Sequence, residues 1–134
     1  MAAARAVIFF EDRLLFVQRR ANCRRSLQWC FPGGRIRSEE SPEGACAREV
    51  REEVGLNVTV AKSLLKLPDQ EFFYCTTEYR SIQLCTEESQ AFAWAEPSSL
   101  LSVGQIMDLR IVLQVLRIAG IEPQSLRELD IGAF

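Results

Sequence analysis

Residues 34–56 read GRIRSEESPEGACAREVREEVGL, and this stretch decides the fold because it combines one short helix with a concentration of carboxylates. Ser41 is a good helix N-cap, and Pro42 suits the first helical position, where its missing N–H costs nothing. Gly55 suits the left-handed position that ends a helix. The stretch therefore predicts a helix from about Pro42 to Val54.

The predicted helix has one apolar face and one acidic face, given about 100° of rotation per residue. The apolar face holds Cys46, Ala47, Val50 and Val54, and the acidic face holds Glu49, Glu52 and Glu53. Like charges three or four residues apart disfavour a helix by about 0.2–0.5 kcal/mol per pair, so helix propensity does not explain the acidic face. A bound divalent cation would explain it, whereas the plainer interpretation is a solvated acidic surface.

The residues around the acidic face favour the cation. Phe31-Pro32-Gly33-Gly34 allows a tight backbone turn close to a ligand, and Glu40 lies just before the N-cap. Arg48 lies beside Glu49 and four residues before Glu52, where it can orient a carboxylate by a charge-assisted hydrogen bond. Hard oxygen ligands suit Mg²⁺ or Mn²⁺, and Mg²⁺ takes part of its shell from substrate phosphates.

The spacing of these residues matches a known motif. Gly34, five residues, Glu40, seven residues, then Arg48-Glu49-Val50-Arg51-Glu52-Glu53-Val54-Gly55-Leu56 fits the Nudix box, Gly-x5-Glu-x7-Arg-Glu-U-x-Glu-Glu-x-Gly-U with U a bulky aliphatic residue, at every defined position. The chain thus resembles the Nudix hydrolases. The resemblance implies an enzyme that cleaves the pyrophosphate of a nucleoside diphosphate linked to another group. It also implies an α/β/α sandwich with a mixed β-sheet between helices.

The resemblance further implies roles for the box residues. Glu52 and Glu53 are expected as metal ligands, and Glu49 either as a third ligand or as the base that deprotonates the attacking water. Glu40 and Arg48 are expected to support the ligands by hydrogen bonds. The implied mechanism is hydrolysis assisted by Mg²⁺ or Mn²⁺, because the cation neutralises charge on the pyrophosphate and lowers the pKa of a bound water.

Two further metal contacts are expected outside the acidic face. The resemblance implies that Gly34 contributes its carbonyl oxygen, and that a loop after the box adds a carboxylate. Glu88 is the first candidate and Glu87 the second, because both lie in the loop before the strand that carries Trp94. The other interpretation of either acid is a solvated loop residue.

Substrate contacts are expected from the segment before the box. Leu14-Leu15-Phe16-Val17-Gln18-Arg19-Arg20, an Arg-rich loop and Trp29-Cys30-Phe31-Pro32-Gly33-Gly34 resemble the mutator-type nucleoside triphosphate pyrophosphatases. This resemblance implies that Arg20 meets the nucleotide, with a plain surface cation as the alternative, and Gly33 is expected at the turn near the substrate. Trp29 is a candidate to stack on a base, as are Phe31, Phe72 and Tyr74, unless these rings belong to the core.

Three functions follow from these residues. The first is a metal-dependent pyrophosphatase that converts a (d)NTP or a modified nucleotide to a nucleoside monophosphate and pyrophosphate. The second is a dinucleoside polyphosphate or nucleotide-sugar hydrolase. The third is a non-catalytic Nudix-fold module that binds a nucleotide. The complete set of box acids argues against this third function.

Composition limits the remaining alternatives. The 134 residues predict one domain over 1–134, and a net charge of −2 does not favour binding to nucleic acids. Five cysteines, an odd number, and no histidine make a zinc site or a disulfide scaffold improbable and exclude His-based acid–base catalysis. With neither a signal peptide nor a membrane segment evident, a cytoplasmic setting is expected. The oligomeric state stays open between a monomer and a homodimer.

The rest of the chain predicts an α+β or α/β arrangement. A first hairpin is expected from Arg5–Phe10 and Leu14–Gln18, followed by a polar loop over Arg19–Leu27 and a short strand over Gln28–Phe31. After the box helix we expect a strand over Val58–Leu67, a second hairpin from Glu71–Thr76 and Tyr79–Thr86, and a strand over Ala91–Ala95. A helical turn is expected at Pro97–Leu101 and an amphipathic helix at Gln105–Ile118, whereas residues 121–134 show no decisive pattern.

Overall fold

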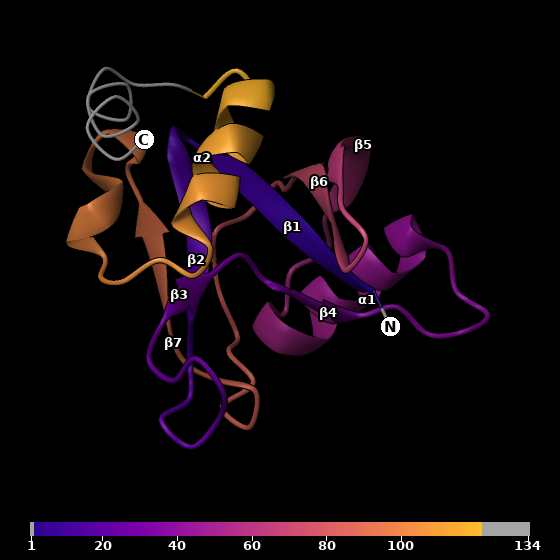
Figure 1. Ribbon diagram of the computed structural model, residues 1–134, viewed down its shortest axis with the longest axis horizontal. Coiled ribbons are helices and arrows are strands. Elements are labelled where there is room, and N and C mark those ends of the chain that lie inside the picture. The colour runs from indigo at the N-terminus through magenta and orange to yellow at the C-terminus, as the bar shows by residue number, and fades with distance from the viewer. Residues whose placement is uncertain (1, 122–134) are drawn as a thin grey trace.

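The computed structural model describes residues 2–121, and these form a mixed sheet with a helix on each side (Figure 1). The strands are β1 (Ala3–Phe10), β2 (Arg13–Arg19), β3 (Trp29–Cys30), β4 (Gly33–Arg35), β5 (Thr59–Lys66), β6 (Gln70–Thr76) and β7 (Ser89–Ala95). The helices are α1 (Pro42–Val54), the short 3₁₀ helix η1 (Pro97–Ser102) and α2 (Leu109–Ile118). The sequence predicted most of these elements within a few residues.

The sheet is split along its middle, between β1 and β2. The two strands pair only beside their turn, at Phe9 with Leu14 and Phe10 with Arg13. Beyond that point β1 pairs with β4 and, in parallel, with β6, whereas β2 pairs with β3 and β7. Figure 1 shows β1 and β2 spreading apart away from the hairpin. The segment that carries β3 and β4 therefore enters the opening between the two halves.

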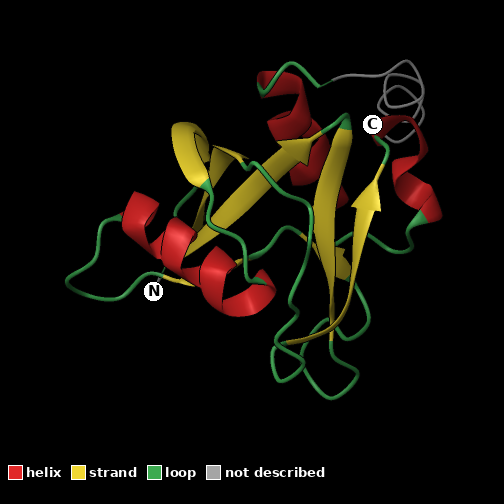
Figure 2. Ribbon diagram, turned by 180° about the vertical axis from the view of Figure 1, so that it is seen from behind, coloured by secondary structure: helices red, strands yellow, loops and turns green. Residues whose placement is uncertain are grey.

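Helices α1 and α2 cover opposite faces of the sheet, as the views from front and back show (Figures 1 and 2). Alternation along β1 explains this arrangement, because successive side chains of a strand point to opposite faces. Ala6 and Ile8 pack in the core cluster of α1, whereas Val7 packs in the core cluster of α2. The expected α/β/α sandwich with a mixed sheet is confirmed.

Helix α1 has the predicted bounds and caps. The Ser41 hydroxyl accepts a hydrogen bond from the Gly44 N–H at 3.0 Å, and Gly55 ends the helix with a φ of 74°. Cys46, Val50 and Val54 of the apolar face are buried in the core as expected, whereas Ala47 is only half-buried. One residue of the acidic face, Glu53, is also buried, which the helical pattern alone does not show.

The second hairpin was predicted in the wrong place. The strands β5 and β6 form it around Pro68-Asp69, and residues 79–86 are a loop rather than a strand. The N–H groups of Gln83 and Cys85 donate to the carbonyls of Val54 and Glu53 at the end of α1, at 2.9 and 2.8 Å. Alternate residues of this loop thus face a helix terminus, which produces a strand-like pattern without a strand.

Helix α2 is shorter than predicted, since it begins at Leu109 rather than Gln105. Backbone bonds with Trp29 hold the preceding residues extended: the Trp29 N–H donates to the Gln105 carbonyl and the Met107 N–H donates to the Trp29 carbonyl, both at 2.8 Å. Strand β7 also begins earlier than expected, at Ser89. Of residues 121–134, all but Ile121 lie outside the described part of the chain.

All five cysteines, which lie within the described residues, are free thiols, in agreement with the sequence. Cys23 is exposed, and the other four are buried or half-buried. Over the described residues, none of the helices combines the length and the apolar character needed to cross a membrane.

The Ser41 cap gives a direct test of α1. We expect Ser41→Ala to lower the free energy of unfolding by about 1 kcal/mol, because the Gly44 N–H loses its acceptor. Urea unfolding monitored by circular dichroism measures this difference. The matched control is Ser38→Ala, at an exposed position just before the helix. Equal effects of the two substitutions would contradict the cap.

Candidate active site

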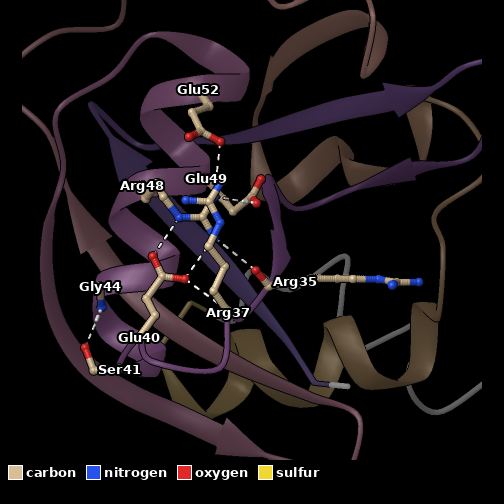
Figure 3. A network of polar contacts seen from close by, with 8 residues as sticks. All are labelled: Arg35, Arg37, Glu40, Ser41, Gly44, Arg48, Glu49 and Glu52. Carbon is tan, nitrogen blue, oxygen red and sulfur yellow. Dashed lines mark hydrogen bonds and ion pairs between the residues drawn. The ribbon is translucent and has the colours of Figure 1, made fainter.

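Arg48 is the centre of the acidic cluster on α1 (Figure 3). Its Nε and Nη2 donate to the two carboxylate oxygens of Glu40 at 2.6 and 2.9 Å. Its Nη1 donates to Glu49 at 2.9 Å and to Glu52 at 3.1 Å. The guanidinium also donates to the carbonyl of Arg35 at 3.1 Å, which ties the helix to β4. One cation therefore orients three of the box carboxylates.

These bonds fix the ionisation of the Arg48–Glu40 pair. The bonds from Arg48 and from the Arg37 N–H lower the pKa of Glu40 from its ordinary 4.5 to about 2. The hydrogen bonds to Glu40 and Glu49 raise the pKa of Arg48. Glu40 is therefore a carboxylate at neutral pH that is bonded to Arg48. Its supporting role in the site stays a prediction.

Glu53 is held separately from this network. Its side chain is buried, with 6% of the residue exposed, and both of its oxygens accept hydrogen bonds. The Gly33 N–H donates to Oε1 at 3.1 Å, and the Ser89 hydroxyl donates to Oε2 at 2.8 Å. Burial raises the pKa of Glu53, and the two hydrogen bonds act in the opposite direction. Sequence reasoning missed Ser89 because it read this residue as part of a polar loop.

The loop after β6 brings Glu88 to the acidic face. The Arg20 guanidinium donates to the Thr86 carbonyl, two residues before Glu88, and so anchors the loop. The pKa of Glu88 is raised by partial burial and then by the charges of Glu49 and Glu52. Four carboxylates of the site therefore repel one another, since Glu88 also raises the pKa of Glu53.

The two glycines of the turn have different neighbours. A side chain at Gly33 would overlap the backbone carbonyl of Ala4, and Gly33 has a φ of +153°. A side chain at Gly34 would overlap the carboxylate of Glu49 instead. Gly33 is thus needed for β4 to pair with β1, and Gly34 leaves room for the Glu49 carboxylate beside the backbone.

The donor set fits a hard divalent cation. Carboxylates of Glu49, Glu52, Glu53 and Glu88 gather on one side of α1, and their mutual repulsion would be relieved by a cation. Among the described residues, no group of three or more acidic or cysteine side chains is arranged so that it could hold a metal ion. The contacts explain this, because Glu49 and Glu52 are turned towards Arg48 while Glu53 is bonded to Ser89.

Some residues predicted to contact the substrate lie in the core, and others do not. Phe31 and Phe72 are core residues, 1% and 3% exposed, so they do not stack on a base. Trp29 is half-buried and lies against Gly104, and Arg20 bonds the loop of Glu88. A substrate role for Trp29, Arg20 or Gly33 stays a prediction.

The fold and this acidic helix define a structural class. A Nudix-family hydrolase from Clostridium perfringens has a TM-score of 0.70 to this structure at 22% identity, covering 90% of this chain and 97% of that one. The MutT protein of Methanosarcina mazei has a TM-score of 0.69 at 20% identity, covering 89% of this chain and 92% of that one. The class is therefore the Nudix fold.

The NUDIX domain family matches residues 1–116, and the chain belongs to it. A CTP pyrophosphohydrolase of Escherichia coli K12 is 27% identical over 104 residues, which are 72% of this chain and 76% of that protein. An 8-oxo-dGTP diphosphatase of Proteus vulgaris is 37% identical over 60 residues, 40% of this chain and 54% of that protein. The chain is accordingly a hydrolase of the nucleotide pyrophosphatase type, as the box predicts.

The low pKa of Glu40 predicts a pH-dependent contribution to stability. A carboxyl whose pKa is lowered on folding stabilises the protein above its unfolded pKa, and this contribution is lost as the pH falls. We therefore expect Glu40→Gln to be less stable than wild type at neutral pH. The difference should shrink between pH 4.5 and about pH 2.

Urea unfolding of metal-free protein across this pH range measures the Glu40 effect. Glu39→Gln is the matched control, since Glu39 is exposed and lies one residue away. A stability difference that stays constant down to about pH 2 would contradict the assignment.

The two glycines predict separate defects. Gly33→Ala should destabilise the fold by about 2 kcal/mol or more, because the backbone of Ala4 cannot move aside. Gly34→Ala should keep most of the stability, since the flexible Glu49 side chain can shift, but should lose about 100-fold in activity. Thermal unfolding and steady-state hydrolysis distinguish the two, and a stable, active Gly34→Ala protein would refute the close approach.

Proposed function

We propose that this protein is a metal-dependent pyrophosphatase that converts a (d)NTP or a modified nucleotide to a nucleoside monophosphate and pyrophosphate. The observation that carries the proposal is the complete set of box carboxylates, organised by Arg48 and closed by Glu88 from the loop. The triphosphate substrate is supported by the relatives named for CTP and 8-oxo-dGTP.

The residues that would hold Mg²⁺ or Mn²⁺ are Glu52, Glu53, Glu88 and the carbonyl oxygen of Gly34, with Glu49 as a further ligand or as the base. When bound, the cation would neutralise charge on the pyrophosphate and make a water more acidic. The carboxylates among these residues repel one another, and a hard cation favours such negatively charged oxygen ligands.

The chain's own side chains would supply orientation and a proton acceptor. Ser89 and the Gly33 N–H hold both oxygens of Glu53, so this carboxylate cannot rotate freely. Glu49 receives the Arg48 bond on Oε1, which leaves Oε2 to accept the proton of the attacking water. With Glu49 as the base rather than as a ligand, Arg48 would orient this carboxylate without contacting the reacting water.

The alternative substrates remain distinguishable by experiment. Dinucleoside polyphosphates and nucleotide sugars present the same pyrophosphate to the acids, because the box recognises phosphate and metal rather than the group beyond them. A binding module that does not turn over its nucleotide has no use for four oriented carboxylates, and the arrangement around Arg48 speaks against it.

The test is product release from (d)NTPs, 8-oxo-dGTP, diadenosine polyphosphates, ADP-ribose and nucleotide sugars with Mg²⁺ or Mn²⁺. We expect metal-dependent hydrolysis of nucleoside triphosphates that Glu53→Gln abolishes and that Glu39→Gln retains. Binding of Mn²⁺ to the protein alone, followed by electron paramagnetic resonance, should weaken in Glu53→Gln. Hydrolysis of only another class of substrate would overturn the proposed triphosphate substrate. Tight nucleotide binding without hydrolysis would support the binding module.

A further inference from the structure

Arg20 connects strand β2 with the loop that carries Glu88. It is the first residue after β2, and its guanidinium donates from Nη1 to the Thr86 carbonyl, two residues before Glu88. Arg20 and Thr86 are 66 positions apart in the chain, so this bond joins segments that only the fold brings together. A hydrogen bond from a charged guanidinium is stronger than one between neutral groups. Arg20 can therefore hold the loop in place.

The pairing of β2 with β7 brings Arg20 to this point. Arg19 pairs with Ser89 at one end of the two antiparallel strands. On its other side, the Arg19 N–H donates to the Gln28 carbonyl at 2.9 Å. Because Arg20 follows Arg19 and Glu88 precedes Ser89, Arg20 and Glu88 flank the same end of the strand pair. The Arg20 side chain thus extends from a fixed piece of backbone.

Glu88 belongs to a turn, residues 86–88, whose two ends are bonded to Glu53. Before the turn, the Cys85 N–H donates to the Glu53 carbonyl at 2.8 Å. After the turn, the Ser89 hydroxyl donates to the Glu53 carboxylate, also at 2.8 Å. The N–H groups of Glu88 and Ser89 close the turn by donating to the Cys85 carbonyl at 3.1 and 3.2 Å. The position of this turn therefore decides where the Glu88 carboxylate lies relative to the acids of α1.

The turn has little packing of its own. Thr86, Glu87 and Glu88 are all exposed, and exposed backbone with few buried contacts opens easily. The guanidinium of Arg20, which is half-buried, bonds the first carbonyl of the turn from the side of β2. Without this bond, the turn would be held only at its two ends.

We infer that Arg20 is a positioning residue, which holds the turn 86–88 so that the Glu88 carboxylate faces the acids of α1. Arg20 acts through Glu88 and not by contact with the nucleotide, which is the role that the sequence predicted for it. The inference rests on the proposed function, because Glu88 is there a ligand of the divalent cation.

A double-mutant cycle in the hydrolysis of nucleoside triphosphates tests the inference. We expect Arg20→Gln to lower kcat about 10-fold, because residues that orient ligands typically matter this much. KM should change less than about two-fold, since the nucleotide loses no contact. Glu88→Gln should lower kcat at least as much, and Arg20→Gln/Glu88→Gln should be no worse than Glu88→Gln alone. Arg20→Lys, which keeps a cationic donor, should recover part of the loss.

Mn²⁺ binding to the protein without nucleotide, followed by electron paramagnetic resonance, gives a readout that does not depend on turnover. We expect the Kd for Mn²⁺ to rise about 10-fold in Arg20→Gln and in Glu88→Gln, with no further rise in the double variant. Hydrogen exchange at the amides of Glu88 and Ser89 should be faster in Arg20→Gln. A merely structural role would lower the unfolding midpoint without this change in Kd.

The matched control is Arg13→Gln. Arg13 is the first residue of β2, and its guanidinium bonds Glu96, the residue after β7, at 3.1 Å. The substitution therefore removes a similar bond from the opposite end of the same strand pair. We expect kcat and the Kd for Mn²⁺ to stay within about two-fold of wild type, because exposed ion pairs contribute little.

The outcomes separate this inference from the proposed function. Losses that multiply in the double variant, or a higher KM with unchanged Mn²⁺ binding, would overturn the inference in favour of direct nucleotide contact. Unchanged Mn²⁺ binding in Glu88→Gln would also overturn it, while hydrolysis by wild type would still support the proposed function. If wild type hydrolyses no nucleotide, the proposed function fails. The Mn²⁺ cycle then decides the inference, which a Kd unchanged by Arg20→Gln would overturn.

Discussion

The site depends on the guanidinium of Arg48. The acidic face of α1 places like charges three and four residues apart, and in the folded protein they also face a carboxylate from the following loop. Arg48 compensates part of this repulsion through bonds to Glu40, Glu49 and Glu52, and only 12% of its side chain is exposed to solvent. Because the guanidinium is planar and its donors point in fixed directions, the carboxylates are also oriented by it.

The split sheet determines what can surround this cluster. Where β1 and β2 separate, β3 and β4 cross from one half to the other, and β4 leads into α1 through the loop 36–41. Glu53 is bonded to Gly33 from this crossing segment and to Ser89 from β7, so one buried carboxylate joins both halves of the sheet.

The sequence predicted features with local causes. The bounds of α1 follow from Ser41, Pro42 and Gly55, and the first hairpin follows from two apolar runs around Glu11-Asp12. Loop 79–86 was wrongly predicted as a strand because Ile82 and Leu84 pack on the core at alternate positions, as they would in a strand. The partners of its N–H groups lie on a helix some thirty residues earlier, and nothing local indicates them.

The residues of the candidate site also divide into those that local sequence indicates and those that depend on tertiary structure. Spacing alone indicated the acids of α1 and Arg48, since a helix brings i, i+3 and i+4 together. Burial of Glu53 and its bond to Ser89 depend on where β7 starts, which tertiary pairing decides. Five arginines that line one cavity are spread over three strands and a loop, so only the folded chain brings them together; they are Arg5, Arg19, Arg24, Arg25 and Arg35.

The loop that follows β6 has a consequence for the stability of α1. The C-terminal end of a helix carries partial negative charge, so Glu52 and Glu53 occupy its least favourable turn. Free carbonyls of that turn accept from the N–H groups of Gln83 and Cys85, which follow the β5–β6 hairpin in the chain. An isolated peptide of this length and charge would have little helical structure. The helix that carries the box acids therefore depends on the surrounding fold for its stability.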